Sequence, residues 1–510
     1  MSIYEGGSGD LNNIMFQGTA SNVGKSIISA GICRVLWQDG YRVGPFKSQN
    51  MSLNSYIDKY GGEMGRAQVF QAEACNLLPR AYMNPILLKP SGNHMSQLIM
   101  KGKFIKNISS SDYQDLKPDL VGWLGQVYQR YQRDFDIVVL EGAGSPVEIN
   151  INKLDISNME MARIADSPVV LVADIDRGGV FASIVGTLSL MSDEERSRVK
   201  GVIINKFRGR KDYFSEGVRL LEDIIKIPVL GVVPYQKLGI DEEDGVSEKT
   251  YKEAKQVYRK DKLNVVVLKL DHMSNYTDFN VFEHIEGLEL SYISPDQDLE
   301  ASDGQNGQVG PDLLIIPGSK NTLGDMERLN KSPMRDQILA YSKRGGLIVG
   351  LCGGYQMLGQ TIRDDRGLDG SRGKVDGLGL LEVDTVFGSD KITGQVRWNF
   401  GHEEGYFFGL ENSQIEGYET HLGRTYPGPD DNYKIKNGHI MGTYCHGLFD
   451  SAGFLSGLLN NIAKAKGLAR AFEVKDYRAI KNEEYNKLAD LIRENIDMEK
   501  VYNIIFSRDI

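Results

Sequence analysis

Short runs of β-branched and other apolar residues recur along the chain, and each run ends at Gly, Asp, Asn or Pro. In the first half these runs predict strands at 14–17, 42–46, 136–141, 169–174, 202–205 and 229–233. Helical patterns separate them, as at 25–37, 62–74 and 193–200. Strands that alternate with helices predict right-handed βαβ units and a parallel sheet. In such sheets, ligands bind at the carboxyl ends of the strands.

A charged stretch with few large apolar residues, 236–262, is interpreted as a linker or a peripheral helix. A second α/β series follows, with strands predicted at 263–270, 313–317, 346–351 and 378–387, shorter strands to about 449, and an exposed loop at 301–311. After residue 450 the pattern becomes helical, at 454–466 and 485–496. We therefore predict an α/β protein in four segments: a parallel-sheet domain at 1–240, a linker at 241–262, a second α/β domain at 263–450, and a helical extension at 451–510 that packs on the second domain.

Composition supports a folded protein with several domains. The chain has 510 residues, of which 41% are apolar and 25% charged, and 57 are Gly. The apolar fraction excludes a disordered chain, and the glycine excess over the usual ~7% indicates many tight turns near ligands. A net charge of −10, from 69 acidic and 59 basic residues, gives no general attraction to nucleic acid or to an anionic membrane.

Cysteine usage and the N-terminus bear on the cellular compartment. The four cysteines are scattered without a C-x-x-C pair, which argues against structural zinc and favours a reducing compartment. The first residues are polar rather than signal-like, and no apolar run reaches about 18 residues. We therefore expect a cytoplasmic protein that binds neither nucleic acid nor membrane. The sequence does not indicate an oligomeric state.

The first motif that carries chemistry is GTASNVGKS at 18–26, which follows a predicted strand and begins a predicted helix. This is the context of a phosphate-binding loop, although an ordinary glycine-rich turn is the alternative. Glycine lets backbone N–H groups approach phosphate oxygens, and the helix start adds partial positive charge. The spacing, with one extra residue between the glycines, resembles that of dethiobiotin synthetases. We predict that ATP is bound by Gly18, Thr19, Gly24, Lys25 and Ser26.

Polar residues at the ends of later strands extend this prediction. The Ser26 hydroxyl and Glu141, which ends the strand at 136–141, are predicted to bind Mg²⁺. Lys47 ends the second strand and is predicted to neutralise a transferring phosphoryl group. Asn205 is predicted to hydrogen-bond the adenine. The alternatives are a solvated strand-end glutamate, a surface lysine and a turn-forming asparagine.

The second motif is GLCGGYQ at 350–356, where an apolar strand runs into G-x-C-x-G and then a predicted helix. This arrangement is typical of a nucleophile elbow, in which a helix N-terminus favours the thiolate of Cys352. The best candidate for its base among the histidines is His446, at the end of a predicted strand in YCHG. Cys445 lacks a glycine-rich setting and is assigned to the core; structural roles for Cys352 and His446 are the alternatives.

A cysteine with a histidine fits a cysteine hydrolase, a thiol redox enzyme or a glutamine amidotransferase. The ATP site favours the third, because ammonia released from glutamine is useful beside a site that activates a carboxylate. Further segments carry a family resemblance and cover nearly the whole chain: 17–26, 44–51, 62–68, 71–74, 83–90, 174–182, 205–209, 316–322, 351–356 and 442–447. With these segments, the chain resembles the glutamine-dependent cobyric acid synthases of the cobalamin pathway. FKSQNM, NPILLKP and DIDRGG are family-specific as a set.

The resemblance implies an N-terminal synthetase domain of the P-loop type and a C-terminal amidotransferase domain of class I type. It implies ATP- and glutamine-dependent amidation of the b, d, e and g carboxylates of adenosylcobyrinic acid a,c-diamide, a corrin, to adenosylcobyric acid. Cys352 and His446 fall on the family's catalytic pair. Most class I amidotransferases have Glu two residues after this His; here Leu448 stands there, so a dyad is expected. Backbone N–H groups near Gly318 and Gly353 are candidates for an oxyanion hole.

Two rival functions stay open on the sequence. Cobyrinic acid a,c-diamide synthase performs similar chemistry on other carboxylates, although the segments around Gln49, Asn50 and Lys89, expected to face the corrin, resemble cobyric acid synthases better. A partition-type ATPase switch fused to a degenerate amidotransferase-like module would have an additional lysine near the loop start, where this chain has Phe-Gln-Gly, and would not need Cys352.

Overall fold

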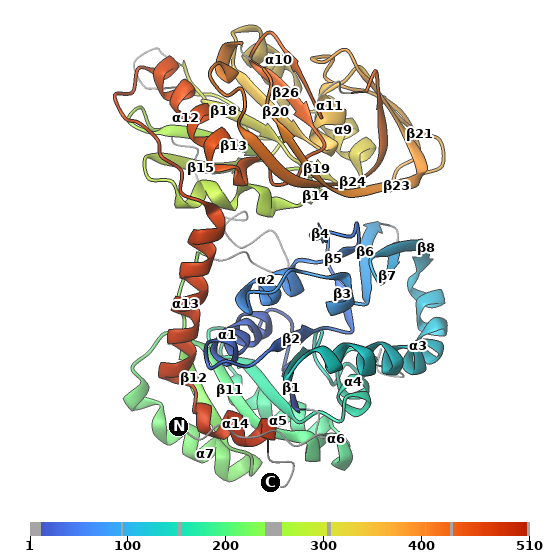
Figure 1. The fold of residues 1–510 in the computed structure, drawn as a ribbon, viewed down its shortest axis with the longest axis vertical. Helices are drawn as coiled ribbons and strands as arrows, with labels where there is room; N and C mark the ends of the chain where they lie inside the picture. The colour runs from blue at the N-terminus through green and yellow to red at the C-terminus, as the bar shows by residue number, and fades with distance from the viewer. Residues whose placement is uncertain are drawn as a thin grey trace.

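The structure, a computed structural model, describes residues 12–92, 95–149, 155–239, 258–302, 308–402, 404–428 and 432–506. Two α/β units, each built on a six-stranded sheet, lie one above the other (Figure 1). The long helix α13 (Tyr477–Asn495) runs down one side and joins them (Figure 1). The predicted fold class, a P-loop-type parallel-sheet domain followed by a second α/β domain, is confirmed.

The sheet of the first unit has strand order β12-β11-β10-β1-β9-β2, and all its neighbouring strands are parallel. Its strands are almost wholly apolar and buried, as expected when helices cover both faces. All six were predicted, with small shifts at their ends. They are β1 (Asn12–Gly18), β2 (Val43–Phe46), β9 (Ile137–Glu141), β10 (Val169–Asp174), β11 (Val199–Phe207) and β12 (Val229–Pro234).

Helices cover both faces of this sheet. Alternate strand residues belong to two separate cores, with Met15 and Leu140 in one and Phe16 and Val139 in the other. The predicted helix at 62–74 is wrong at its start, because 63–65 form strand β5. The helices are α1 (Lys25–Gln38), α2 (Arg66–Ala74), α3 (Ser110–Tyr131), α4 (Met159–Ile164), α5 (Val180–Leu190), α6 (Asp193–Arg198) and α7 (Ser215–Ile225).

A small second sheet was missed by the sequence prediction. Its strand order is β3-β6-β7-β8. Together with the hairpin β4-β5, it lies on the side of the first unit that faces the second (Figure 1). Its strands are short and mix polar with apolar residues, so their pattern is weak. They are β3 (Gln49–Met51), β4 (Ser55–Ile57), β5 (Glu63–Gly65), β6 (Ile86–Gly92), β7 (Met95–Met100) and β8 (Lys103–Ser109).

The second unit is built on the sheet β15-β13-β18-β20-β26-β25, in which only β25 is antiparallel to its neighbour. The strands are β13 (Leu263–Leu268), β15 (Leu288–Ile293), β18 (Leu313–Ile316), β20 (Leu347–Leu351), β25 (Tyr433–Lys436) and β26 (Ile440–Thr443). Its helices are α9 (Thr322–Asn330), α10 (Met334–Lys343), α11 (Gly353–Leu358) and α12 (Ala452–Lys466).

A four-stranded sheet, β22-β21-β23-β24, extends the second unit along the face toward the first (Figure 1). The strand predicted at 378–387 is largely wrong, because the strand begins only at 384 and runs to 399. In the predicted loop, residues 301–302 and 308–309 pair as two short strands, β16 (Ala301–Ser302) and β17 (Gln308–Val309). The strands of the larger sheet are β21 (Thr361–Asp364), β22 (Gly373–Asp376), β23 (Asp384–Asn399) and β24 (Gln414–Tyr426).

Contrary to the sequence prediction, the C-terminal helices do not all pack on the second unit. Helix α12 packs on the second unit as expected, but α13 and α14 (Met498–Phe506) pack on the first. Gly31 of α1 allows close contact, since a Cβ there would lie 2.5 Å from Cγ1 of Ile492. The buried guanidinium of Arg34 donates to Asn482 at 2.7 Å and to Asn486 at 2.8 Å. The predicted linker lies outside the described residues except for 258–262.

Candidate active sites

The phosphate loop joins the central strand β1 to helix α1. Gly24 immediately precedes α1 and has a φ of +92°, a left-handed conformation that favours glycine. Gly18 is equally constrained, because a Cβ there would lie 2.7 Å from Val23 and 2.8 Å from Nζ of Lys25. The backbone N–H of Thr19 donates to Val172 at 3.0 Å, which anchors the loop to β10. The loop backbone is therefore held close to the start of the helix.

The side chains predicted to serve this loop meet at Glu141, the buried last residue of β9. Its Oε1 accepts hydrogen bonds from Ser26 at 2.9 Å and from Lys47 at 2.8 Å, and Gln71 of α2 donates to Oε2. Burial alone would raise the pKa of Glu141, but Lys47 with Lys25 and Ser26 outweighs it and lowers the pKa. A carboxylate that stays ionised beside a hydroxyl is a hard-oxygen donor pair, which suits Mg²⁺.

Lys25 and Asn205 lie at the same loop. The ammonium of Lys25 donates to the carbonyls of Ala20 at 3.2 Å and Gly144 at 3.1 Å, so it lies within the loop's curve. The amide nitrogen of Asn205 donates to Val23 at 2.9 Å, which places the side chain beside the loop at the end of β11. In the described part of the chain no group of three or more His, Cys, Asp and Glu residues forms a metal site, and Mg²⁺ commonly needs only one or two carboxylates.

Cys352 lies between β20 and helix α11, as the elbow motif predicts. Its φ of +51° and ψ of −105° are rare for a residue with a side chain, and such strain is typical of a nucleophile at a sharp strand-to-helix turn. The flanking glycines are required by contact: a Cβ on Gly350 would lie 2.7 Å from the carbonyl oxygen of Gly354, and one on Gly354 would overlap that of Ile316. The thiol donates to the carbonyl of Thr420 at 3.8 Å.

The imidazole of His446 lies against this thiol and against a carboxylate that no sequence motif indicated. Nδ1 of His446 is 2.7 Å from Oδ2 of Asp278, and both side chains are buried. The backbone N–H of Gly447 also donates to Asp278, at 3.0 Å. Burial lowers the pKa of His446, but the charge and hydrogen bond of Asp278, with a contribution from Cys352, outweigh it and raise the pKa to about 9. The expected dyad therefore has a third member.

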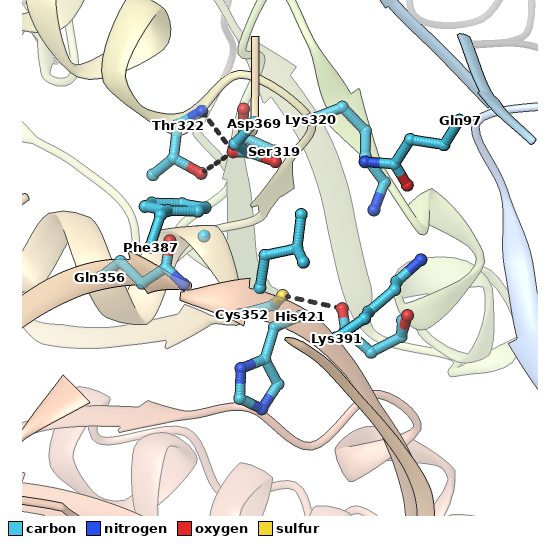
Figure 2. A pocket seen from close by; sticks show the side chains of 13 residues that line it. Gln97, Ser319, Lys320, Thr322, Cys352, Gln356, Asp369, Phe387, Lys391 and His421 are labelled. Atoms are coloured by element: carbon cyan, nitrogen blue, oxygen red, sulfur yellow. Dashed lines mark hydrogen bonds between the residues drawn. The ribbon is translucent and has the colours of Figure 1, made fainter. Parts of the chain in front are cut away.

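A small pocket, partly open to solvent, lies at the thiol. Figure 2 shows Thr322 and Asp369 on one side and Lys320 and Lys391 on the other. Thr322 donates to Asp369 from its backbone at 3.0 Å and from its hydroxyl at 2.9 Å. Burial raises the pKa of Asp369 to about 6, so the carboxyl is mostly ionised at neutral pH.

The synthetase side of this pocket carries buried charge. Gln97 of β7 lines the pocket, so the pocket lies at the contact between the two units. Lys391 of β23 forms an ion pair across that contact with Glu63, which also accepts from Lys89 at 2.5 Å. Burial alone would raise the pKa of Glu63, but Lys391 and Lys89 outweigh it and hold it well below its ordinary value. Lys89 is buried and pairs with Glu63 here, and the expectation that its segment faces the corrin stays a prediction.

Comparison with known proteins places the whole chain in one family. It is 46% identical over 508 residues to the cobyric acid synthase of Clostridium botulinum (strain Alaska E43 / Type E3), covering 97% of this chain and 99% of that protein. It is 44% identical to the cobyric acid synthase of Alkaliphilus metalliredigens (strain QYMF), covering 96% and 99%. The chain belongs to the cobyric acid synthase family. It is therefore a glutamine-hydrolysing, amide-forming ligase.

Two family models match the two units of this chain. A CobQ/CobB/MinD/ParA nucleotide-binding domain matches residues 14–245, and a CobB/CobQ-like glutamine amidotransferase domain matches residues 264–454. These matches confirm the synthetase and amidotransferase assignments and the link to cobalamin biosynthesis. Among the described residues, no helix combines the length and apolar character needed to cross a membrane.

The structure brings together every residue predicted for the two sites. The loop residues surround one end of β1, with Lys47, Glu141 and Asn205 beside them, and Cys352 lies against His446. Cys445 is buried in the core, and burial raises its pKa well above the ordinary value. Asp278 and the charged pocket residues were missed. Asp278 lies 168 positions from His446, and its segment NYTDF has no pattern that marks it as functional.

Proposed function

We propose that this chain uses ATP and glutamine to amidate the b, d, e and g carboxylates of adenosylcobyrinic acid a,c-diamide, yielding adenosylcobyric acid. One observation carries the proposal: a phosphate loop and a thiol–imidazole–carboxylate group occur in one chain, and a residue of the synthetase unit lines the thiol's pocket. A corrin carboxylate is a poor electrophile until it is activated. The two sites supply activation and nitrogen respectively.

In the synthetase unit, the chain's residues position ATP for attack by the corrin carboxylate on its γ-phosphorus. Lys25 and the loop N–H groups hold the phosphates, and Lys47 offsets charge on the transferring group. Ser26 and Glu141 would hold Mg²⁺, which supplies charge neutralisation at the phosphate oxygens. The bond to ADP breaks as the carboxylate–phosphorus bond forms. The product is an acyl phosphate whose phosphate is a good leaving group.

The charged pocket residues match the two ends of an amino acid. Lys320 lines the pocket, and within the described residues its ammonium makes no hydrogen bond or ion pair, so it is available to the α-carboxylate of glutamine. The ionised Asp369 is available to the α-ammonium group. With both ends held, the side-chain amide of glutamine is directed to the thiol of Cys352.

At the thiol, His446, whose pKa is raised to about 9, holds the proton of Cys352, so that sulfur attacks the amide carbon as the thiolate. The proton passes to the departing nitrogen, the carbon–nitrogen bond breaks, and ammonia leaves. Asp278 holds the imidazole and stabilises its protonated form, while backbone N–H groups near Gly318 and Gly353 bind the oxyanion. Water then hydrolyses the thioester and releases glutamate. Ammonia attacks the acyl phosphate and expels phosphate, so each amide consumes one ATP and one glutamine.

Two rival functions predict different products. A cobyrinic acid a,c-diamide synthase would amidate cobyrinic acid and leave its a,c-diamide untouched. An ATPase switch with a degenerate amidotransferase module would not need the Cys352–His446–Asp278 arrangement, which therefore favours an active amidase.

The deciding experiment is mass spectrometry of the corrin after incubation with ATP, Mg²⁺ and glutamine. We expect adenosylcobyrinic acid a,c-diamide to give a ladder of one-amide steps that ends four amides higher, and cobyrinic acid to be the poorer substrate. A ladder only from cobyrinic acid would assign the rival synthase. If the protein hydrolysed ATP but formed no amidated corrin, the ATPase-switch function would be favoured.

A further inference from the structure

Strand β24 of the amidotransferase unit holds both members of the catalytic pair. Tyr418 and His446 exchange backbone hydrogen bonds, at 3.1 Å from the Tyr418 N–H and 2.8 Å from the His446 N–H. The tyrosine ring also stacks on the imidazole, with 5.2 Å between ring centres and 24° between planes. Two residues further on, the carbonyl of Thr420 accepts from the Cys352 thiol. A shift of β24 would therefore move the imidazole relative to the thiol.

The hydroxyl of Tyr418 reaches into the synthetase unit. It donates to the backbone carbonyl of Ser55 at 3.1 Å and accepts from Arg66 at 2.7 Å and from Asn275 at 3.0 Å. Its ring packs edge-on against Tyr56, with 5.2 Å between ring centres. Burial raises the pKa of Tyr418 far above its ordinary value, so the phenol keeps the proton that it donates. The hydroxyl of the residue stacked on His446 thus has two of its three hydrogen-bond partners in the synthetase unit.

Arg66 is the first residue of α2, and the same helix contacts the phosphate site. Gln71, about 7.5 Å further along the helix at 1.5 Å per residue, donates to Oε2 of Glu141. A metal ion bound by Glu141 would compete with Gln71 for that carboxylate. One rigid helix of nine residues therefore contacts the proposed metal ligand and, through Tyr418, the imidazole of the glutaminase site.

We propose that Arg66 and Tyr418 are positioning residues for His446, and that α2 transmits to them, through Gln71, the binding of metal and nucleotide at Glu141. Glutamine is then hydrolysed fastest when the synthetase site is loaded, which limits the waste of ammonia. The proposal rests on the proposed function for the metal–nucleotide site. It makes the glutaminase site incomplete without a residue of the synthetase unit.

The test measures glutamine hydrolysis by the full chain with and without Mg–ATP and adenosylcobyrinic acid a,c-diamide. For the parent protein we expect loading to raise kcat by ~10-fold, within the usual range of coupling between sites. Arg66→Met and Tyr418→Phe should lower kcat and abolish this response, while KM for glutamine stays within about twofold because Lys320 and Asp369 are intact. Arg66→Lys, which retains a donor, should recover part of the response. Amidation from free ammonia should persist.

A matched control lies on the same helix. Glu73 of α2 points instead to α13, where it is hydrogen-bonded to Lys481 and Tyr485, so Glu73→Gln should keep the response that Gln71→Leu loses. Tyr418→Phe removes a single oxygen and remains informative if Arg66→Met does not fold. Unchanged kcat and response in the folded Arg66 and Tyr418 variants would overturn the proposal, as would a parent protein whose glutaminase ignores loading.

A second readout separates this proposal from the proposed function. The rate at which a glutamine-analogue alkylator labels Cys352, followed by mass spectrometry with and without Mg–ADP, requires no corrin chemistry. Faster labelling with Mg–ADP in the parent and not in Tyr418→Phe would support the positioning role even if no corrin were amidated. Equal acceleration in both proteins would reject it even if the amide ladder formed as expected.

Discussion

The two active sites of this enzyme are assembled in different ways. In the phosphate site, five of the predicted residues lie within 18–26, and one strand–loop–helix connection places them. In the thiol site, Asp278, Cys352 and His446 come from three distant segments, brought together by the parallel sheet and by strand β24. Local backbone geometry creates the loop of the first site, whereas tertiary packing creates the whole of the second. Substitutions within the loop should therefore disable the phosphate site. Substitutions at residues distant in sequence from Cys352 should disable the thiol site.

The largest effect is expected for Lys25→Ala. This change removes the ammonium that the loop surrounds, and because both nitrogen sources require the acyl phosphate, synthesis from glutamine and from ammonia should both fall by ~10³-fold or more. The measurement is corrin amide formed with each nitrogen source. Cys352 should still be labelled by a glutamine analogue, which shows that the variant is folded. Normal amidation with ammonia would refute the phosphate-loop assignment.

Cys352→Ala should separate glutamine-dependent synthesis from ammonia-dependent synthesis. Glutamine-dependent synthesis should be lost, while synthesis from ammonia at high pH, where the neutral nucleophile is abundant, should remain near that of the parent. The matched control is Cys445→Ala, since Cys445 neighbours His446 in sequence but is buried in the core. A folded Cys352 variant that had lost both activities would mean that the thiol site also supports activation of the corrin.

This contrast explains what the sequence could and could not predict. Loop and elbow were predictable because glycines at fixed spacing report a backbone conformation, as the φ of +92° at Gly24 and +51° at Cys352 illustrate. Asp278 was not, because a carboxylate that meets its histidine from 168 positions away leaves no periodic signal. The docking of α13 onto the first unit was also missed. It is permitted by Gly31, a single glycine in a helical pattern, which does not indicate a tertiary partner far away in sequence.

Asp278→Asn should expose the contribution of the third member. Without the carboxylate, burial would lower the pKa of His446 from about 9, and the imidazolium that favours the thiolate would be lost at neutral pH. We expect glutaminase kcat to fall by ~10²-fold. Alkylation of Cys352 should be slower than in the parent at pH 7, with the difference shrinking as pH rises through 9. Asp271→Asn, at a surface pair with Arg328, serves as the control. If Asp278→Asn left the pH dependence of Cys352 alkylation unchanged, the catalytic group would be a dyad of Cys352 and His446 without Asp278.

The smallest effect is expected at Asn205, which lies on the distant strand β11 but contacts the phosphate loop. Its amide nitrogen supports the phosphate loop through Val23, and its oxygen is the group that would accept a hydrogen bond from the adenine amine. Asn205→Ala should therefore raise KM for ATP by ~5-fold, about one hydrogen bond, and should narrow the preference for ATP over GTP. Both nucleotides are compared in ammonia-dependent synthesis, which bypasses the thiol site. If the two KM values rise by the same factor, Asn205 supports only the loop, and adenine is recognised elsewhere.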